Sequence, residues 1–132
     1  MAKKTTVREL WKDIPDEHDF PAALSYLSLI CGQKTAEALV DSLREAQTET
    51  RKAKDLLRAS GLPLLPKSNF HVGSDLKKIA KGIPLSPVLV VRGSISDQIS
   101  MTVADGYHRI CASYQISEDE DIPCRIVEPI YL

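Results

Sequence analysis

The chain has 132 residues, 43% of them hydrophobic, so it is long enough for one domain with its own core and too short for two full domains. Its 17 Lys and Arg residues nearly balance 18 Asp and Glu residues, and the formal net charge is −1 at pH 7. This balance argues against strong binding to nucleic acid or to an anionic membrane surface.

The N-terminus and the cysteines bear on the compartment. Residues 1–10 include two lysines but no apolar run, so they do not resemble a signal peptide, and no stretch approaches the roughly 18 apolar residues of a membrane helix. Cys31, Cys111 and Cys124 are odd in number and widely spaced, which fits a reducing compartment better than a disulfide framework. We therefore expect a cytoplasmic protein with no membrane association.

The first part of the chain, residues 1–61, has the periodicity of helices. Apolar residues recur at helical spacing over residues 22–30, and Gly32 provides a stop. A longer apolar stripe over residues 36–57 predicts one continuous helix over residues 34–60.

The polar face of this long predicted helix contains pairs of opposite charge. Arg51 and Asp55 are four residues apart and Glu49 and Lys52 are three apart, which is the spacing of surface ion pairs on a helix. The N-terminal helices carry no convergent polar cluster. Their outer faces are interpreted as solvated surface or, alternatively, as a docking surface for a protein partner.

The second part, residues 62–132, has the pattern of strands with short connecting helices. Residues 62–66 are expected to be extended, because each proline disfavours the helical conformation of the residue before it. Residues 70–72 are predicted as a short strand, and Ser74 is expected to cap a brief helix over residues 75–80.

An unbroken apolar run, Pro87-Val88-Leu89-Val90-Val91, is typical of a central strand buried on both faces. A turn over residues 93–98 and an alternating pattern over residues 99–104 predict that a second strand forms a hairpin with it. The elements expected after this hairpin are a helix, an acidic loop and a final strand, over residues 110–114, 117–121 and 124–127.

Together these elements predict an α/β (α+β) protein. A helical N-terminal part, residues 1–61, is expected to pack on a small mixed sheet provided by residues 62–132. The two parts are expected to form one compact domain.

The segment Asp105-Gly106-Tyr107-His108-Arg109 is the candidate active centre. A strand that turns directly into a helix leaves the first N–H groups of the helix unpaired and its positive dipole end exposed, which favours an anion. Gly106 permits a sharp turn and the close approach of a ligand. His108 adds a titratable charge, and Arg109 adds a permanent charge that can bind phosphate with two nitrogens.

The polar residues of this segment also have structural interpretations. Asp105 has three candidate roles: orienting His108, holding a metal bound to phosphates, or capping the helix. Asp105 and His108 are the candidate catalytic residues. The alternative for His108 and Arg109 is that their polar groups are satisfied within the fold.

The sequence gives little support for a metal site formed by side chains alone. His71, His108, Cys111 and Cys124 are available as ligands, but no two have the close CxxC or HxxxH spacing of recognised sites. No such metal site is predicted.

From Asp75 to Glu128, about 40% of the chain, the order of elements resembles the ParB/sulfiredoxin-like superfamily. The resemblance includes a short helix, the lead Ile83-Pro84-Leu85-Ser86-Pro87 into a Val-rich strand, a second strand, a Gly-x-His-Arg loop that opens a helix, and a closing strand over residues 122–127. The corresponding loop reads Gly-Cys-His-Arg in sulfiredoxins and Gly-Glu-Arg-Arg or related sequences in ParB proteins. Both groups use it to hold nucleotide phosphates. The whole chain also resembles a bacterial family with this ending.

The resemblance implies that Gly106, Tyr107, His108 and Arg109 bind the phosphates of a nucleotide such as ATP, ADP or CTP, with Mg²⁺ as a companion ion. It also implies activity as a nucleotide hydrolase or phosphotransferase. The chain departs from the sulfiredoxin pattern at Tyr107, which stands where the catalytic cysteine would be, so the nucleophile is missing.

Two alternatives to nucleotide binding remain. One is a catalytically silent interaction module that binds a protein through its N-terminal helices. The other is a DNA-associated ParB-like nuclease, against which the balanced charge and the lack of a long basic helix-turn-helix part both argue.

Overall fold

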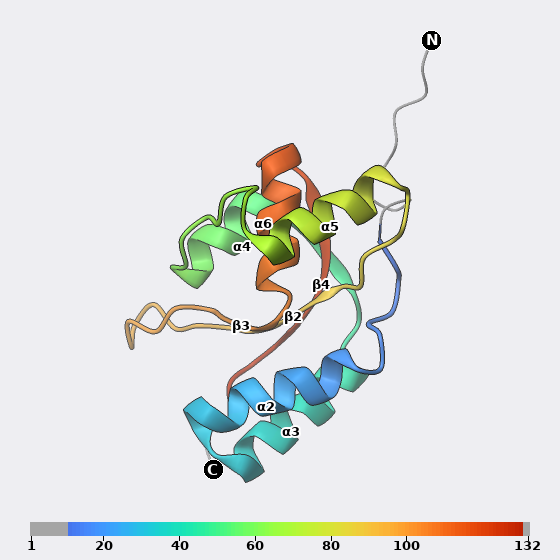
Figure 1. The fold of residues 1–132 in the computed structure, drawn as a ribbon. Coiled ribbons are helices and arrows are strands. Elements are labelled where there is room, and N and C mark those ends of the chain that lie inside the picture. The colour runs from blue at the N-terminus through green and yellow to red at the C-terminus, as the bar shows by residue number, and fades with distance from the viewer. Residues whose placement is uncertain (1–10, 131–132) are drawn as a thin grey trace.

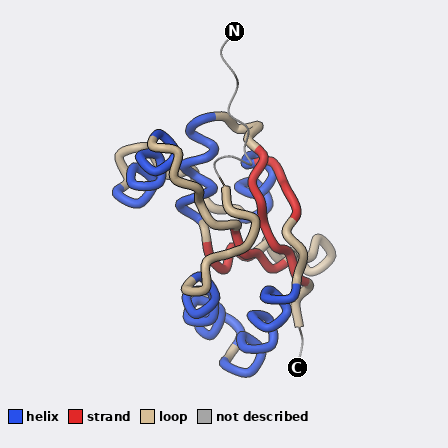
Figure 2. Tube along the Cα trace, turned by 90° about the vertical axis from the view of Figure 1, so that its right-hand side faces the viewer, coloured by secondary structure: helices blue, strands red, loops and turns tan. Residues whose placement is uncertain are grey.

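The computed structural model describes residues 11–130, which are arranged as a sheet between two groups of helices (Figure 1 and Figure 2). Helices α2 (Asp19–Cys31) and α3 (Gln33–Glu45) cover one face of the sheet. Helices α4 (Ala53–Ser60), α5 (Phe70–Ala80) and α6 (Tyr107–Ile116) lie on the other side. The predicted α+β class, with helices at the N-terminal end, is confirmed. The segment expected to lack a signal peptide, residues 1–10, lies outside the described residues.

The sheet is mixed and has the strand order β1-β4-β2-β3. Its strands are β1 (Glu49–Lys52), β2 (Val88–Val91), β3 (Thr102–Asp105) and β4 (Asp121–Val127). Strand β2 pairs in parallel with β4 and antiparallel with β3, and β4 pairs antiparallel with β1. All four residues of β2 are buried, as its unbroken apolar run predicted.

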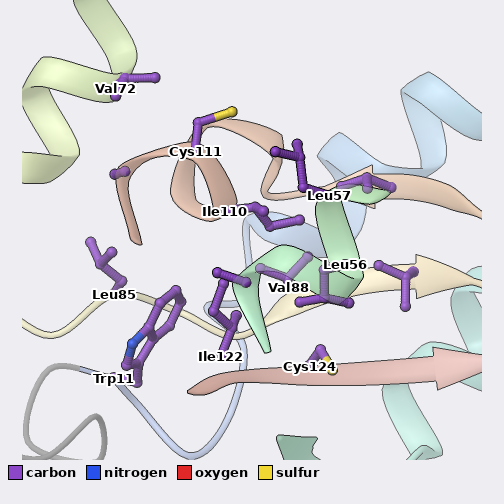
Figure 3. Close-up of a cluster of buried hydrophobic side chains, with 14 residues drawn as sticks. Trp11, Leu56, Leu57, Val72, Leu85, Val88, Ile110, Cys111, Ile122 and Cys124 are labelled. Carbon is purple, nitrogen blue, oxygen red and sulfur yellow. The ribbon is translucent and has the colours of Figure 1, made fainter. Parts of the chain in front are cut away.

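Alternate residues of the strands face two separate cores. Val88 and Ile122 point into the core beneath α4 and α6, whereas Leu89, Val91 and Val127 point toward α2 and α3. Figure 3 shows the first core, whose labelled members also include Trp11, Leu56, Leu57, Leu85, Ile110 and Cys124. Because both faces of the sheet are covered, the central strand β2 has apolar residues at all four positions.

The prediction of one continuous helix over residues 34–60 is wrong. Helix α3 ends at Glu45, and residues 49–52 form β1 before α4 begins. The apolar spacing continues through both helices, but the main chain between them pairs with the edge of β4, where Glu49 lies opposite Cys124. Tertiary pairing, which a local periodicity cannot report, therefore overrides the helical pattern.

The ion pairs predicted for that long helix are also wrong, because three of the four residues, Glu49, Arg51 and Lys52, lie in a strand. Residues two apart in β1 share a face of the sheet, and Lys52 reaches across to the neighbouring strand. The pairs observed are Arg51 with Glu49 at 2.9 Å, Lys52 with Asp121 at 2.8 Å and Arg58 with Asp55 at 3.1 Å.

The strand predicted over residues 70–72 is instead the first turn of α5. The side chain of Asn69 accepts hydrogen bonds from the backbone N–H groups of His71 at 3.0 Å and Val72 at 3.1 Å. The helix is therefore capped by Asn69, and the prediction that Ser74 is the cap is wrong. Helix α5 consequently has 11 residues, and its polar face extends further than the sequence indicated.

Arg125 of β4 is buried beneath the end of α3, a position that the sequence did not indicate. Its Nη1 donates hydrogen bonds to the carbonyls of Leu43 at 3.1 Å and Arg44 at 2.8 Å, and its Nε donates to Thr48 Oγ1 at 3.2 Å. Carbonyls in the last turn of a helix lack intrahelical donors, so the guanidinium acts as a C-terminal cap. Burial lowers the pKa of Arg125, which marks the cost of placing this cation there.

Replacing Arg125 by methionine should lower the free energy of unfolding by about 2–4 kcal/mol, because two buried carbonyls lose their donor. Urea unfolding followed by circular dichroism measures the change. Arg58→Met is the matched control, since Arg58 is exposed on α4, and its effect should stay within about 0.5 kcal/mol. Equal effects of the two substitutions would contradict the capping role.

Candidate functional site

The segment that joins β3 to α6 makes a turn that requires glycine. Gly106 has a φ of 112°, which is in the left-handed region. A Cβ added there would lie 2.9 Å from Cγ2 of Val88, closer than real Cβ contacts allow. The turn therefore brings the backbone directly over β2, and the side chains of Asp105 and Arg109 meet across it.

The N-terminus of α6 is open. Its first intrahelical hydrogen bond runs from Ile110 N–H to the Gly106 carbonyl at 3.0 Å, and no side chain caps the helix. Among residues 11–130, no acceptor is found for the backbone N–H groups of Tyr107, His108 and Arg109. The capping role considered for Asp105 is therefore wrong, and the helix presents free donors and a positive dipole end.

Arg109 is held by groups from three parts of the fold. Its Nη2 donates to Asp105 Oδ2 at 2.9 Å and to the Pro87 carbonyl at 3.3 Å, and it lies 3.8 Å from Asp19 Oδ2. Asp19, only 3% exposed at the start of α2, also accepts a hydrogen bond of 2.6 Å from the Ser86 hydroxyl. One guanidinium thus serves two carboxylates from different elements.

This network contains two carboxylates, Asp19 and Asp105, but only one guanidinium, that of Arg109. Burial raises the pKa of Asp105 above its ordinary value and the nearby charge of Asp19 adds to the shift, while Arg109 opposes it. The Nε of Arg109 is buried and has no hydrogen-bond partner within the described part of the chain. With its side chain 16% exposed, Arg109 belongs largely to the interior and contributes only part of its guanidinium to the surface.

A polar pocket of about 240 Å³ lies between α5 and the start of α6. Its lining brings together the predicted segment and four residues from α5. These residues are His71, Ser74, Asp75 and Lys78 from α5, and Asp105, Gly106, His108 and Arg109 from the turn and α6. The turn that the sequence singled out is therefore one wall of a two-walled pocket.

The titratable groups of the pocket influence one another. The rings of His71 and His108 have centroids 4.7 Å apart, and burial together with His71 lowers the pKa of His108 below its ordinary value. Burial raises the pKa of Asp75, while Arg109, Lys78 and both imidazoles oppose that rise. The pocket consequently holds carboxylates that accept protons easily and an imidazole that is mostly neutral at pH 7.

The side chain of Tyr107 points away from this pocket. Its hydroxyl donates a hydrogen bond to the Pro63 carbonyl, so the ring fastens the extended segment to α6. One turn further on, burial raises the pKa of the Cys111 thiol. Neither position supplies a thiolate, so the sulfiredoxin type of nucleophile is not found at this turn.

Four pocket residues were missed by the sequence analysis, although a signal for them exists. His71, Ser74, Asp75 and Lys78 are spaced by three, one and three residues, which places them on one face of a helix. Assigning residues 70–72 to a strand concealed this face. A helix starting at Asn69 would have revealed a polar stripe.

The histidines and cysteines considered as metal ligands do not converge on one point. Within residues 11–130, the group that brings three ligand atoms within 4.8 Å of one another is Asp16, His18 and Asp19. Asp16 is paired with Lys12 at 2.6 Å, and Asp19 is engaged by Ser86. The proximity of these three residues is therefore accounted for by contacts within the protein, and we assign no metal ion to them.

Comparison of the chain with family models, with curated proteins and with solved structures found no match. Among the helices described, none has both the length and the apolar character needed to cross a lipid bilayer. The similarity to the ParB/sulfiredoxin-like superfamily thus remains a prediction, and the functional argument depends on the geometry of the pocket.

Arg109→Ala should lower the free energy of unfolding by about 3–5 kcal/mol, because the buried Asp19 loses the only permanent cation near it among the described residues. Arg109→Lys should recover part of this loss, since lysine keeps the charge without the fork. Adding Asp19→Asn to Arg109→Ala should restore stability relative to the single variant, by about 1–3 kcal/mol of coupling. Unchanged stability of Arg109→Ala in chemical unfolding would show that the guanidinium is free for a ligand.

Proposed function

We propose that the pocket between α5 and α6 binds the phosphate groups of a nucleotide or a related phosphorylated small molecule. The observation that carries this proposal is the convergence of positive groups on one small polar pocket. The open N-terminus of α6, the ammonium of Lys78 and part of the Arg109 guanidinium face the same volume. Free backbone N–H groups at a helix N-terminus are favourable donors to phosphate oxygens.

The size of the pocket restricts which part of a nucleotide lies inside. Pockets that enclose a drug-sized ligand have volumes of about 300–1,000 Å³. At about 240 Å³, this pocket is large enough for phosphate groups but leaves the nucleoside outside. The phosphates therefore supply most of the affinity, and discrimination between bases is expected to be weak.

The two carboxylates of the pocket suggest how a divalent ion would participate. Asp105 already accepts a hydrogen bond from Arg109, whereas no side-chain hydrogen bond to the Asp75 carboxylate is found among residues 11–130. Carboxylate oxygens suit Mg²⁺, which usually binds one or two protein carboxylates together with substrate phosphates. Asp75 is thus the better placed residue for an ion that accompanies the phosphates.

Hydrolysis or phosphoryl transfer is the reaction that this arrangement suits. Donors aimed at phosphate oxygens stabilise the charge of the transition state, and a group that exchanges protons near neutral pH can assist the nucleophile. Asp105 and His108 remain the catalytic candidates, and Asp75 joins them because its carboxylate lines the same pocket and burial raises its pKa above the ordinary value. The acceptor of the phosphoryl group would approach from the open side of the pocket.

A panel of ATP, ADP, CTP, GTP and pyrophosphate, each with and without Mg²⁺, should raise the melting temperature of the protein. A ligand at 100 times its dissociation constant stabilises the fold by about 2.7 kcal/mol, which thermal-shift measurements detect readily. Pyrophosphate should act as well as the nucleotides, because the phosphates make the contacts. If every member of the panel leaves the melting temperature unchanged, the alternative of a silent interaction module is favoured.

The lysines of α5 provide a matched pair of variants for the same measurement. Lys78 lines the pocket and Lys77 does not, yet both side chains are exposed and neither supports the core. Lys78→Ala should weaken pyrophosphate binding by about tenfold or more, as expected for the loss of a charge-assisted hydrogen bond. Lys77→Ala should change it little. Equal losses would indicate general electrostatic attraction in place of a site.

Binding should strengthen as the pH falls, and His108 should carry part of that dependence. Because the pKa of His108 lies below the ordinary 6.5, its imidazolium forms only as the pH drops past that value, and it then attracts the anion. Sulfate, whose charge is constant over this range, is the probe, titrated by calorimetry at pH 5 and pH 7.5. His108→Gln should weaken binding more at pH 5 than at pH 7.5. Because Asp75 titrates in both proteins, the difference between them isolates His108, and identical pH profiles would exclude its role.

A further inference from the structure

A larger groove lies at the opposite end of β3 from the phosphate pocket. Its volume is about 820 Å³, within the range of about 300–1,000 Å³ typical of small-molecule sites. The groove is bounded by α4 on one side and by the β2–β3 hairpin on the other, and the hairpin extends away from the rest of the sheet in Figure 1. Met101 directly precedes the first residue of β3, and Asp105 is the last residue of the strand.

The floor of the groove is apolar. Leu56 of α4, Ile126 of β4 and Met101 lie along it, and Ile99 of the hairpin, which is half exposed, forms part of its wall. Ile126 and Met101 belong to the face of the sheet that α4 and α6 cover elsewhere. The groove is therefore the part of this face that no helix of the described chain covers, and it suits the hydrocarbon portion of a ligand.

Two arginines stand at the rim of this apolar surface. Arg51 of β1 is paired through its Nε with Glu49 at 2.9 Å, and Arg92 is paired through its Nε with Glu128 at 2.6 Å. Within residues 11–130, no hydrogen bond from the terminal nitrogens of either guanidinium group is found. The planar forks are thus free to bind a carboxylate or a similar oxyanion, in the paired geometry that arginine favours.

From the apolar floor and the free arginine forks, we propose that the groove binds a small amphipathic organic anion, with its hydrocarbon part over Met101 and its acidic head at either Arg51 or Arg92. A medium-chain carboxylate has this chemistry. The existing pairs with Glu49 and Glu128 oppose it little, because exposed ion pairs contribute only slightly to stability and exchange partners readily. This site is independent of phosphate binding at α6.

Methionine supplies a direct reporter, because the chain contains two methionines, Met1 and Met101. With ¹³C-labelled methionine methyl groups, decanoate added below its critical micelle concentration should shift the Met101 signal, and the Met1 signal serves as the internal reference. The neutral analogue 1-decanol measures the apolar contribution alone. Decanoate should bind about tenfold or more tightly than 1-decanol, as expected for charge-assisted contacts to the acidic head.

Variants of the protein test the contacts of the acidic head and those of the hydrocarbon part separately. Replacing both Arg51 and Arg92 by glutamine should reduce the affinity for decanoate to that for 1-decanol, whereas Lys77→Gln, which removes an equal charge on α5 outside the groove, should leave it unchanged. Ile99→Asp places a negative charge in the wall at a half-exposed position and should abolish binding of decanoate. An unshifted Met101 signal, equal affinities for decanoate and 1-decanol, or full binding by the double variant would each overturn the proposal.

Discussion

The guanidinium of Arg109 joins elements that the sequence places far apart, and the site is built around it. Its Nη2 meets Asp105 at the end of β3 and Asp19 at the start of α2, so the helices on opposite sides of the sheet are connected through one cation. The same guanidinium lines the polar pocket between α5 and α6. An anion that enters the pocket must therefore share this cation with two carboxylates. Ligand affinity and the stability of the fold are coupled by that sharing, because both depend on how the charge of Arg109 is divided.

The sequence predicted those features that are encoded within a few neighbouring residues. The four apolar residues of β2 indicated a strand buried on both faces, and the alternation that follows them indicated a hairpin. The motif from Asp105 to Arg109 correctly marked a turn from a strand into a helix, because Gly106 and the charged residues after it are local signals. Helical periodicity likewise located α2 and the end of α4, where Gly61 adopts the left-handed conformation of a helix C-terminus.

The features that were missed depend on partners distant in sequence or on one mistaken assignment. No local pattern shows that Arg125 caps α3, since its acceptors at Leu43 and Arg44 precede it by about 80 residues. The break of the long helix at β1 arises from pairing with β4, which periodicity does not report. By contrast, the polar face of α5 was present in the sequence and was hidden by assigning its first turn to a strand. The prediction therefore located one wall of the pocket and missed the other, although the residues of both walls carry local signals.

The position of β4 in the sheet determines the order in which the protein is completed. This strand lies between β1 and β2, and Glu49 of β1 pairs with Cys124, more than 70 residues later in the chain. During synthesis, β1 and β2 have no shared neighbour until residues 121–127 have emerged, so the core between the sheet and the helices α2 and α3 is incomplete until Val127 is in place. The nascent chain thus exposes part of its apolar surface until β4 has been made, a state in which association with other chains competes with folding. This topology therefore favours rapid pairing of β4 with β1 and β2, or shielding of the exposed apolar surface by a chaperone.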